Sequence, residues 1–384
     1  MKIAIDATFN PHGGSLIHLR EFIINLKKMF RDESLRVFIK EENIEIIGKE
    51  ILDGCTLEIV NVSSNKILWI LWLQIILPLK LYKLNYNVLF SPGNISPILK
   101  TTEIKSQWIA TIGPFDTAVY SGLSLKQKII LLINKYLILF SVKTSNVVIH
   151  ESKYSLSLLK NKYSLDTDCQ FLIECGKSNF FNYDININHV ANNYIKDISD
   201  DDLLCVSHFY PYKNMERMIK AFFMFLDNAE DKTTRLFICG LPIFKSYYQT
   251  ILELVTNSNY EKNIIFVGGV NHFDLRYAYS KCRFLLFPSL CESSGYALIE
   301  AMSCGTPILA TRLTAIPFTC GDAALYFDAY DIRDQSLKLQ QLYNDQNTLN
   351  DLSDKSFKRS DAMMNYEEAA DAYFQILVTK LNNL

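Results

Sequence analysis

Two acidic residues and a glycine between residues 287 and 307 have the types and spacing to bind a phosphorylated nucleoside. An apolar run ends at Pro288, and a helical pattern begins after Gly295. Glycine lets the backbone approach a phosphate closely, and the N–H groups that open a helix favour an anion. Glu300, one to two turns into that helix, could accept hydrogen bonds from the vicinal hydroxyls of a ribose. Spacing alone equally favours a structural interpretation, in which Glu292 is an N-terminal helix charge and Glu300 lies on a solvated face.

A second polar segment places a cation between an apolar run and an amphipathic helix. His208, Lys213 and Asn214 follow the run 203–206. Lys213, at the junction of loop and helix, is well placed to meet a phosphate as a point charge. His208 could hydrogen-bond a phosphate and become cationic beside it. The alternative for His208 is a partly buried structural residue.

The segment 287–307 resembles the Glu-x7-Glu signature of the retaining GT-B glycosyltransferases of family 4, also called glycosyltransferase group 1. The positions that agree are Glu292, Gly295, Glu300, Ala301, Met302, Gly305 and Pro307. Ser294 stands where the family usually has phenylalanine, which we expect to alter the packing around the sugar. The loop after residue 206 resembles the family's phosphate loop, in which Lys213 matches the lysine and His208 replaces the usual arginine.

This resemblance implies a role for each matching residue. Glu292 would contact hydroxyls of the donor sugar, Glu300 would hold the ribose, and Lys213 would stabilise the departing diphosphate. The backbone at Gly295 and Tyr296 would receive the phosphate or the sugar. The predicted catalytic residues are Glu292, Lys213 and His208, and the predicted donor-binding residues are Ser294, Gly295, Tyr296, Ala297, Glu300 and Asn214.

The acceptor side is predicted from two loops of the N-terminal half. Gly13 and Gly14 follow a strand-like run and resemble the family's glycine loop beside the acceptor and the donor sugar; they do not form G-x-G-x-x-G, which disfavours a nicotinamide cofactor. Pro114 and Asp116 lie in a loop at a strand end, where Asp116 could contact acceptor hydroxyls or stabilise its own turn. Ala110 stands where many relatives carry a histidine that binds the donor sugar or the acceptor.

Short apolar runs alternate with stretches of helical length and period through both halves of the chain, which is typical of βαβ units in a doubly wound sheet. The predicted strands are 3–5, 37–39, 57–62, 88–90, 108–112, 147–149, 203–206, 236–239, 264–267, 284–288, 308–310 and 324–327. The fold class is therefore α/β, with two Rossmann-like domains facing across a cleft. We expect an acceptor domain over 1–185, with helix 365–384 packing back on it, and a donor domain over 200–364, joined by a polar linker.

The composition excludes some classes of binding partner and cofactor. The chain has 39 basic and 41 acidic residues, so nothing in its charge points to nucleic acid. The nine cysteines include no C-x-x-C pair and are expected to be reduced and buried, with a zinc or redox site as the alternative. The resemblance implies no metal and no cofactor beyond a nucleotide-sugar co-substrate, such as a UDP- or GDP-sugar. We interpret Asp200, Asp201 and Asp202, which precede a strand, as a solvated linker.

The segments 66–83 and 126–143 combine long aliphatic stretches with lysines. They could dock on an anionic inner leaflet, where a lipid-linked acceptor is found. The favoured alternative is a pair of buried helices with snorkelling lysines. The apolar run 67–81 falls short of a bilayer span, and no signal peptide is visible, so a cytoplasmic protein, soluble or peripheral, is expected.

The predicted activity is transfer of a hexose-type sugar from a nucleoside-diphosphate donor to a glycan or polyprenyl-linked acceptor, with retention, in bacterial surface polysaccharide (O-antigen) biosynthesis. One alternative is a nucleotide-sugar epimerase or a phosphorylase on the same fold. The other is a degenerate, non-catalytic partner subunit, which the departures at His208 and Ala110 leave open.

Overall fold

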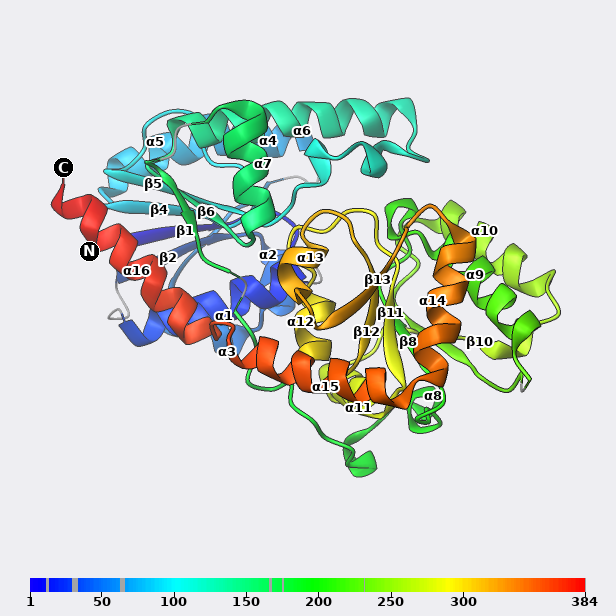
Figure 1. Cartoon of the computed structure of the whole chain (residues 1–384). Helices are drawn as coiled ribbons and strands as arrows, with labels where there is room; N and C mark the ends of the chain where they lie inside the picture. The colour runs from blue at the N-terminus through cyan, green and yellow to red at the C-terminus, as the bar shows by residue number, and fades with distance from the viewer. Residues whose placement is uncertain are drawn as a thin grey trace. The chain divides into compact units, whose positions relative to one another are not determined.

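The computed structural model describes residues 1–11, 14–29, 34–62, 66–165, 168–174, 176–230 and 232–383. These residues form two compact units (Figure 1). The N-terminal unit comprises 1–115, 124–176 and 364–384, and the C-terminal unit comprises 116–123 and 177–363. The main part of the first unit thus extends to residue 176, where the prediction was 185, and the polar stretch expected to link the domains belongs to the second unit.

The N-terminal unit is built on a seven-stranded parallel sheet with the strand order β3-β2-β1-β4-β5-β6-β7. The strands are β1 (Ile3–Ala7), β2 (Leu35–Ile39), β3 (Thr56–Ile59), β4 (Val88–Ser91), β5 (Ile104–Ile109), β6 (Val147–His150) and β7 (Gln170–Leu172). Every residue of β1, β4, β5 and β6 is buried, as expected for central strands covered on both faces. The strand predicted at 108–112 begins earlier and ends at Ile109, and β7 was not predicted.

Helices cover both faces of this sheet (Figure 1). On one face, α1 (Gly14–Met29) packs against the final helix α16 (Tyr366–Asn382), beside α2 (Glu41–Ile47) and α3 (Lys49–Leu52). The aromatic rings of Phe22, Trp108 and Tyr373 meet in this core. The other face carries α4 (Lys66–Leu71), the π-helical turn η2 (Trp72–Ile76), α5 (Leu77–Leu84), α6 (Leu125–Thr144) and α7 (Lys153–Tyr163).

The segment Lys66–Leu84 forms one continuous helix of 19 residues. The π-helical turn precedes Pro78, whose ring removes the hydrogen bond to the carbonyl of residue 74. By length and composition alone this helix could cross a membrane, with a mean hydropathy of 1.6, and 28% of the tested window is buried. We expected the helix at 66–83 to be buried, and this expectation is wrong for the outer face of the helix Lys66–Leu84, which is exposed.

The C-terminal unit contains a six-stranded parallel sheet with the order β10-β9-β8-β11-β12-β13. Its strands are β8 (Leu203–Val206), β9 (Leu236–Cys239), β10 (Ile264–Gly268), β11 (Phe284–Phe287), β12 (Ile308–Thr311) and β13 (Ala324–Phe327). Its α-helices are α8 (Asn193–Lys196), α9 (Met215–Asn228), α10 (Lys245–Thr256), α11 (His272–Lys281), α12 (Tyr296–Ser303), α13 (Ile316–Cys320), α14 (Ile332–Asn344) and α15 (Gln346–Asp361). All six strands match the prediction to within one residue at each end.

Sheet order brings the two polar segments of this unit together. Strand β8 pairs in parallel with β11, although β9 and β10 lie between them in the sequence. The loops that follow β8 and β11 therefore leave the same edge of the sheet, at the carboxyl ends of its strands, where open α/β sheets bind ligands. Helix α12, which follows β11, packs against α11, α13 and α15.

Candidate active site

An ion pair joins the two loops at this edge of the C-terminal sheet. The Lys213 ammonium, at the end of the 3-10 turn Pro211–Lys213, donates to Glu292 Oε1 at 2.6 Å. Both side chains are mostly buried, with 17% of Lys213 and 12% of Glu292 exposed. The N–H of Leu290 donates to the Tyr212 carbonyl at 2.8 Å and ties the same loops by their backbones. Residues 79 positions apart in the sequence thus form one polar centre.

Lys213 keeps its positive charge despite burial. Burial by itself disfavours the ammonium, but the Glu292 carboxylate beside it outweighs this effect and raises the lysine pKa above its ordinary value. The ammonium also lies 5.3 Å from the centre of the Tyr212 ring. This fixed ammonium already contacts one carboxylate. It could bind a phosphate either beside the carboxylate or in its place.

The start of helix α12 supplies a second feature suited to an anion. Gly295 precedes the helix with φ of +82°, in the left-handed region. A Cβ atom at this position would lie 2.8 Å from Leu298 Cδ1, so the leucine side chain would have to shift, and the left-handed conformation itself favours glycine. Gly295, the N-cap residue, has no side chain that could cap this end of the helix. Tyr296 and Ala297, the first two helical residues, therefore present backbone N–H groups where a phosphate could accept hydrogen bonds.

Glu300 lies one turn further along α12. The Tyr279 hydroxyl donates to Glu300 Oε2 at 3.0 Å. Burial raises the pKa of the Glu300 carboxyl to about 7, and the hydrogen bond from Tyr279 offsets only part of this effect. The carboxyl therefore changes protonation state near neutral pH. Tyr279 was not predicted as a site residue, because nothing in the local pattern of α11 distinguishes it from a core tyrosine.

His208 uses one ring nitrogen for a structural hydrogen bond. Its Nδ1 accepts from the Leu241 backbone N–H at 3.0 Å, within the same unit. A protonated imidazole has no acceptor nitrogen, so protonation would break this bond. The bond favours a neutral ring whose Nε2 carries the proton. A cationic His208 in place of the family's arginine is thus disfavoured, and its part in donor binding stays a prediction.

Two further predicted donor-binding residues shape the loops. Asn214 adopts left-handed φ of 57°, donates from its amide to the Ala329 carbonyl at 2.9 Å and accepts from the Arg217 guanidinium at 2.9 Å. Ser294 is buried, and its carbonyl accepts from the Thr319 hydroxyl at 2.6 Å. These contacts fix the loops that carry Lys213 and Gly295, and direct contact with a donor remains predicted.

The structure describes three of the four predicted acceptor residues. Gly13 lies outside the described residues, and Gly14 is the first residue of α1. Asp116 caps the 3-10 turn Thr117–Tyr120 by accepting from the Ala118 N–H at 2.8 Å, which is the turn-stabilising role. Of the three that the structure describes, Pro114 lines a pocket of the N-terminal unit.

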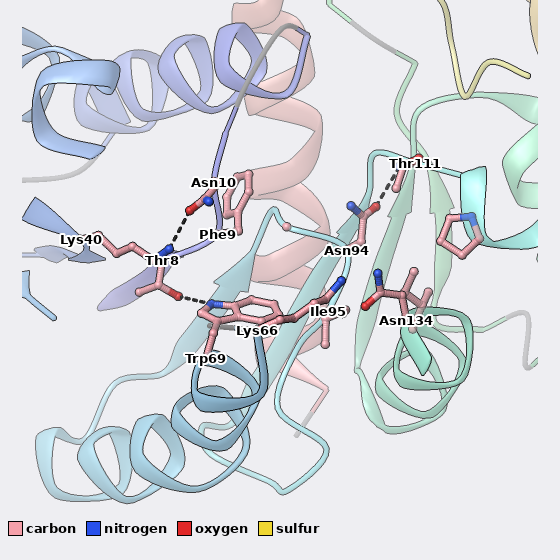
Figure 2. Close-up of a pocket in the computed structure, with 13 residues that line it drawn as sticks. Thr8, Phe9, Asn10, Lys40, Lys66, Trp69, Asn94, Ile95, Thr111 and Asn134 are labelled. Carbon is pink, nitrogen blue, oxygen red and sulfur yellow. Dashed lines mark hydrogen bonds between the residues drawn. The ribbon is translucent and has the colours of Figure 1, made fainter. Parts of the chain in front are cut away.

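That pocket has a volume of about 300 Å³ and lies between α4, α6 and the loops after β1, β4 and β5 (Figure 2). The Trp69 indole N–H donates to Thr8 Oγ1 at 3.0 Å, and the Thr8 hydroxyl donates to the buried Asp6 carboxyl at 2.6 Å. This chain of hydrogen bonds fixes the tryptophan ring at the pocket wall. Asn94 Oδ1 accepts from the Thr111 N–H at 2.8 Å on the opposite side.

One polar atom of the pocket lacks a protein partner. Asn134 of α6 lines the pocket, and its Oδ1 is buried without a hydrogen bond among the described residues (Figure 2). Buried amide oxygens are nearly always paired, so this atom is suited to accept from a bound molecule. Sequence reasoning missed the pocket, because six separate segments build it and none carries a motif.

Within the described residues, no group of three or more His, Cys, Asp or Glu side chains could hold a metal ion. Asp202, interpreted from the sequence as solvated, is in fact buried and pairs with Arg235 at 2.6 Å. The eight cysteines of the described part of the chain are free thiols.

The two parallel-sheet α/β units define a GT-B fold, as predicted. The chain is similar over its full length to sucrose-phosphate synthase (tll1590) from Thermosynechococcus elongatus, with a TM-score of 0.76 and 18% identity, covering 100% of both chains. It is similar to Anabaena Alr3699/HepE, solved in complex with UDP-glucose, with a TM-score of 0.75 and 13% identity, again covering 100% of both chains. At these identities the likeness shows the fold alone.

Residues 192–359, within the C-terminal unit, match the family described as glycosyl transferases group 1. The prediction made from the segment 287–307 is thereby confirmed. The O-antigen chain mannosyltransferase B of Escherichia coli is 30% identical over 136 residues, which are 35% of this chain and 35% of that protein. The match therefore spans about a third of this relative's length. Family 4 membership and retention of configuration stay predictions.

Proposed function

We propose that the protein transfers a hexose-type sugar from a nucleoside-diphosphate sugar to a hydroxyl of a glycan or polyprenyl-linked acceptor, in bacterial surface polysaccharide assembly. The observation that carries this proposal is the Lys213–Glu292 pair, set beside the glycine-led start of α12 in a group 1 glycosyltransferase domain. An O-antigen mannosyltransferase among its relatives and a UDP-glucose complex of the same fold support it.

The donor would be held by the C-terminal unit. As the bond from the anomeric carbon to the diphosphate breaks, negative charge grows on the leaving group. Lys213, which remains cationic, and the N–H groups at the start of α12 would stabilise that charge without reorganising. Glu292 would turn from the lysine to the donor sugar hydroxyls, and ionised Glu300 would accept from the ribose. The charge is neutralised in this way by the chain itself, so we propose that the reaction needs no metal.

The acceptor would be held by the pocket of the N-terminal unit. A volume of about 300 Å³ suits a single sugar residue. The fixed Trp69 ring offers an apolar surface to the C–H face of a hexose, and Asn134 Oδ1 offers an acceptor to one of its hydroxyls.

Product analysis with a panel of nucleotide sugars tests this function. The panel is first screened for thermal stabilisation of the full chain, since a ligand bound by the folded state alone raises the melting temperature. The stabilising donor is then incubated, with EDTA present, with lipid-linked and free glycans. Release of nucleoside diphosphate with sugar in the acceptor is the expected result. An epimerised donor, a requirement for inorganic phosphate, or no turnover with any donor would each refute it.

A further inference from the structure

Two helices of the N-terminal unit present apolar side chains to solvent. We call them the apolar helix pair: the helix Lys66–Leu84 and the helix α6, Leu125–Thr144. Seven large apolar residues of the first helix and six of the second are exposed, among them Leu79 at 61% and Leu125 at 75%. Single exposed apolar residues are ordinary, but a group of this size marks an interaction surface.

Both helices also have an inner face, and the two inner faces share one core. Trp72, Leu73 and Leu77 of the first helix pack in the same cluster as Ile138 and Val142 of α6, against one face of the sheet. The same two helices line the pocket described above (Figure 2). A surface helix of a soluble domain normally pairs an apolar inner face with a polar outer face. In the apolar helix pair, much of the outer face is apolar as well.

The charges on these helices are of one sign. The two segments together contain seven lysines and no aspartate or glutamate, in a chain whose net charge is −2. Lys80 pairs with Glu58 of β3, and Lys66 is partly buried at the pocket. The exposed lysines of the pair are Lys83, Lys126, Lys128 and Lys143.

This combination identifies the partner. Apolar side chains edged by lysines fit an anionic lipid surface, where acyl chains receive the former and headgroups the latter. A second copy of the chain would bring the same positive charge against this surface, so self-association is opposed electrostatically. A bilayer-spanning position is opposed as well, because Trp72, Leu73 and Leu77 would have to leave the core of the unit.

We propose that the apolar helix pair docks the N-terminal unit onto an anionic bilayer and lies in its interface. The inference goes beyond the proposed function, because such docking requires neither donor nor acceptor. If the proposed function also holds, docking brings the pocket that the same helices line to the membrane surface, where a polyprenyl-linked acceptor resides.

Vesicle co-sedimentation of the full chain tests the docking. Vesicles of phosphatidylcholine alone are compared with vesicles containing about one third phosphatidylglycerol, at low and high salt. The chain is expected to bind the anionic vesicles, and less at high salt. K126Q/K128Q should lower the partition coefficient by about fivefold per lysine, about 25-fold in total. L79Q/I133Q should weaken binding to anionic vesicles at both salt concentrations.

Matched variants on the C-terminal unit serve as controls. Leu337 is 65% exposed, and Lys245 and Lys262 are exposed, so L337Q and K245Q/K262Q change similar side chains elsewhere and should bind like the unchanged chain. Equal losses in controls and test variants would overturn the proposal. So would absence of binding to anionic vesicles, or a dimer that L79Q/I133Q converts to monomer in sedimentation velocity.

Failure of this proposal is distinguishable from failure of the proposed function. Nucleotide-induced thermal stabilisation, measured on each variant without vesicles, reports the folded donor-binding unit. A chain that binds vesicles but no nucleotide sugar would refute the function and leave docking intact. A chain that transfers sugar to a water-soluble acceptor but ignores anionic vesicles would refute docking alone.

Discussion

Replacing Lys213 by methionine should lower both the free energy of unfolding and kcat, and a second change at Glu292 should restore only the first. Methionine keeps the aliphatic stem but leaves the Glu292 carboxylate, only 12% exposed, without its cation. Removal of one partner from a mostly buried pair costs about 3 kcal/mol of unfolding free energy. If Lys213 stabilises the departing diphosphate, kcat should fall by about 100- to 1,000-fold, as on the loss of one preorganised charge-stabilising group.

The second change, Glu292→Gln in the Lys213→Met background, gives the sharper test. An uncharged amide tolerates burial better than an unpaired carboxylate, so the double variant should recover about 2 kcal/mol of the lost stability. It should recover none of the lost kcat, because the cation is still absent. Urea unfolding measures the first quantity, and steady-state release of nucleoside diphosphate measures the second.

A surface pair provides the matched control. Lys220 and Glu216 are joined at 2.6 Å on α9, with 42% and 43% of their side chains exposed. Lys220→Met should therefore cost only about 0.4 kcal/mol and leave kcat unchanged. The reasoning is refuted if Lys213→Met retains its turnover, or if the double variant regains turnover together with stability.

Three further predictions concern single side chains. Donor affinity, measured by calorimetry, should weaken as the pH falls from about 8 to about 6. The pKa of the Glu300 carboxyl is raised to about 7, so over this range the carboxyl takes up a proton and no longer accepts a hydrogen bond from the ribose. Glu300→Gln should bind the donor weakly at every pH, and a pH profile unchanged in that variant would contradict the assignment. With a water-soluble acceptor, Trp69→Ala should raise the acceptor KM by about tenfold, through loss of one apolar contact worth about 1.4 kcal/mol, with donor affinity unchanged. Tyr82→Ala, on the same helix but 84% exposed, is the control, and an equal rise in both would contradict the pocket assignment. Burial lowers the pKa of His18 to about 3, so the unfolded chain binds the proton more tightly than the folded chain does. The melting temperature should therefore fall as the pH drops from about 6.5 towards 3, and it should fall less in His18→Phe.

The sequence by itself determined the strands of the C-terminal unit and the segment from β11 to α12. Strand and helix periods are local properties, so β8 to β13 could be placed from runs of a few apolar residues. Glu292, Gly295 and Glu300 lie within nine residues, and their spacing together with the resemblance to the Glu-x7-Glu signature predicted a phosphate and ribose site. The N-terminal unit was harder to predict, because short elements such as β7 and α3 carry too few residues to show a period.

The tertiary structure decided which distant residues meet. Lys213 contacts Glu292 because β8 lies beside β11 in the sheet. This strand order is set by the packing of the whole unit, and no local sequence pattern encodes it. The hydrogen bond between Tyr279 and Glu300, and the pocket around Trp69, likewise join separate segments. The exposure of the apolar helix pair could not be predicted from the sequence either. The sequence pattern of an apolar helix is the same whether its outer face packs against a core or contacts solvent. Periodicity fixes the faces of each element, but the packing of elements against one another decides what each face contacts.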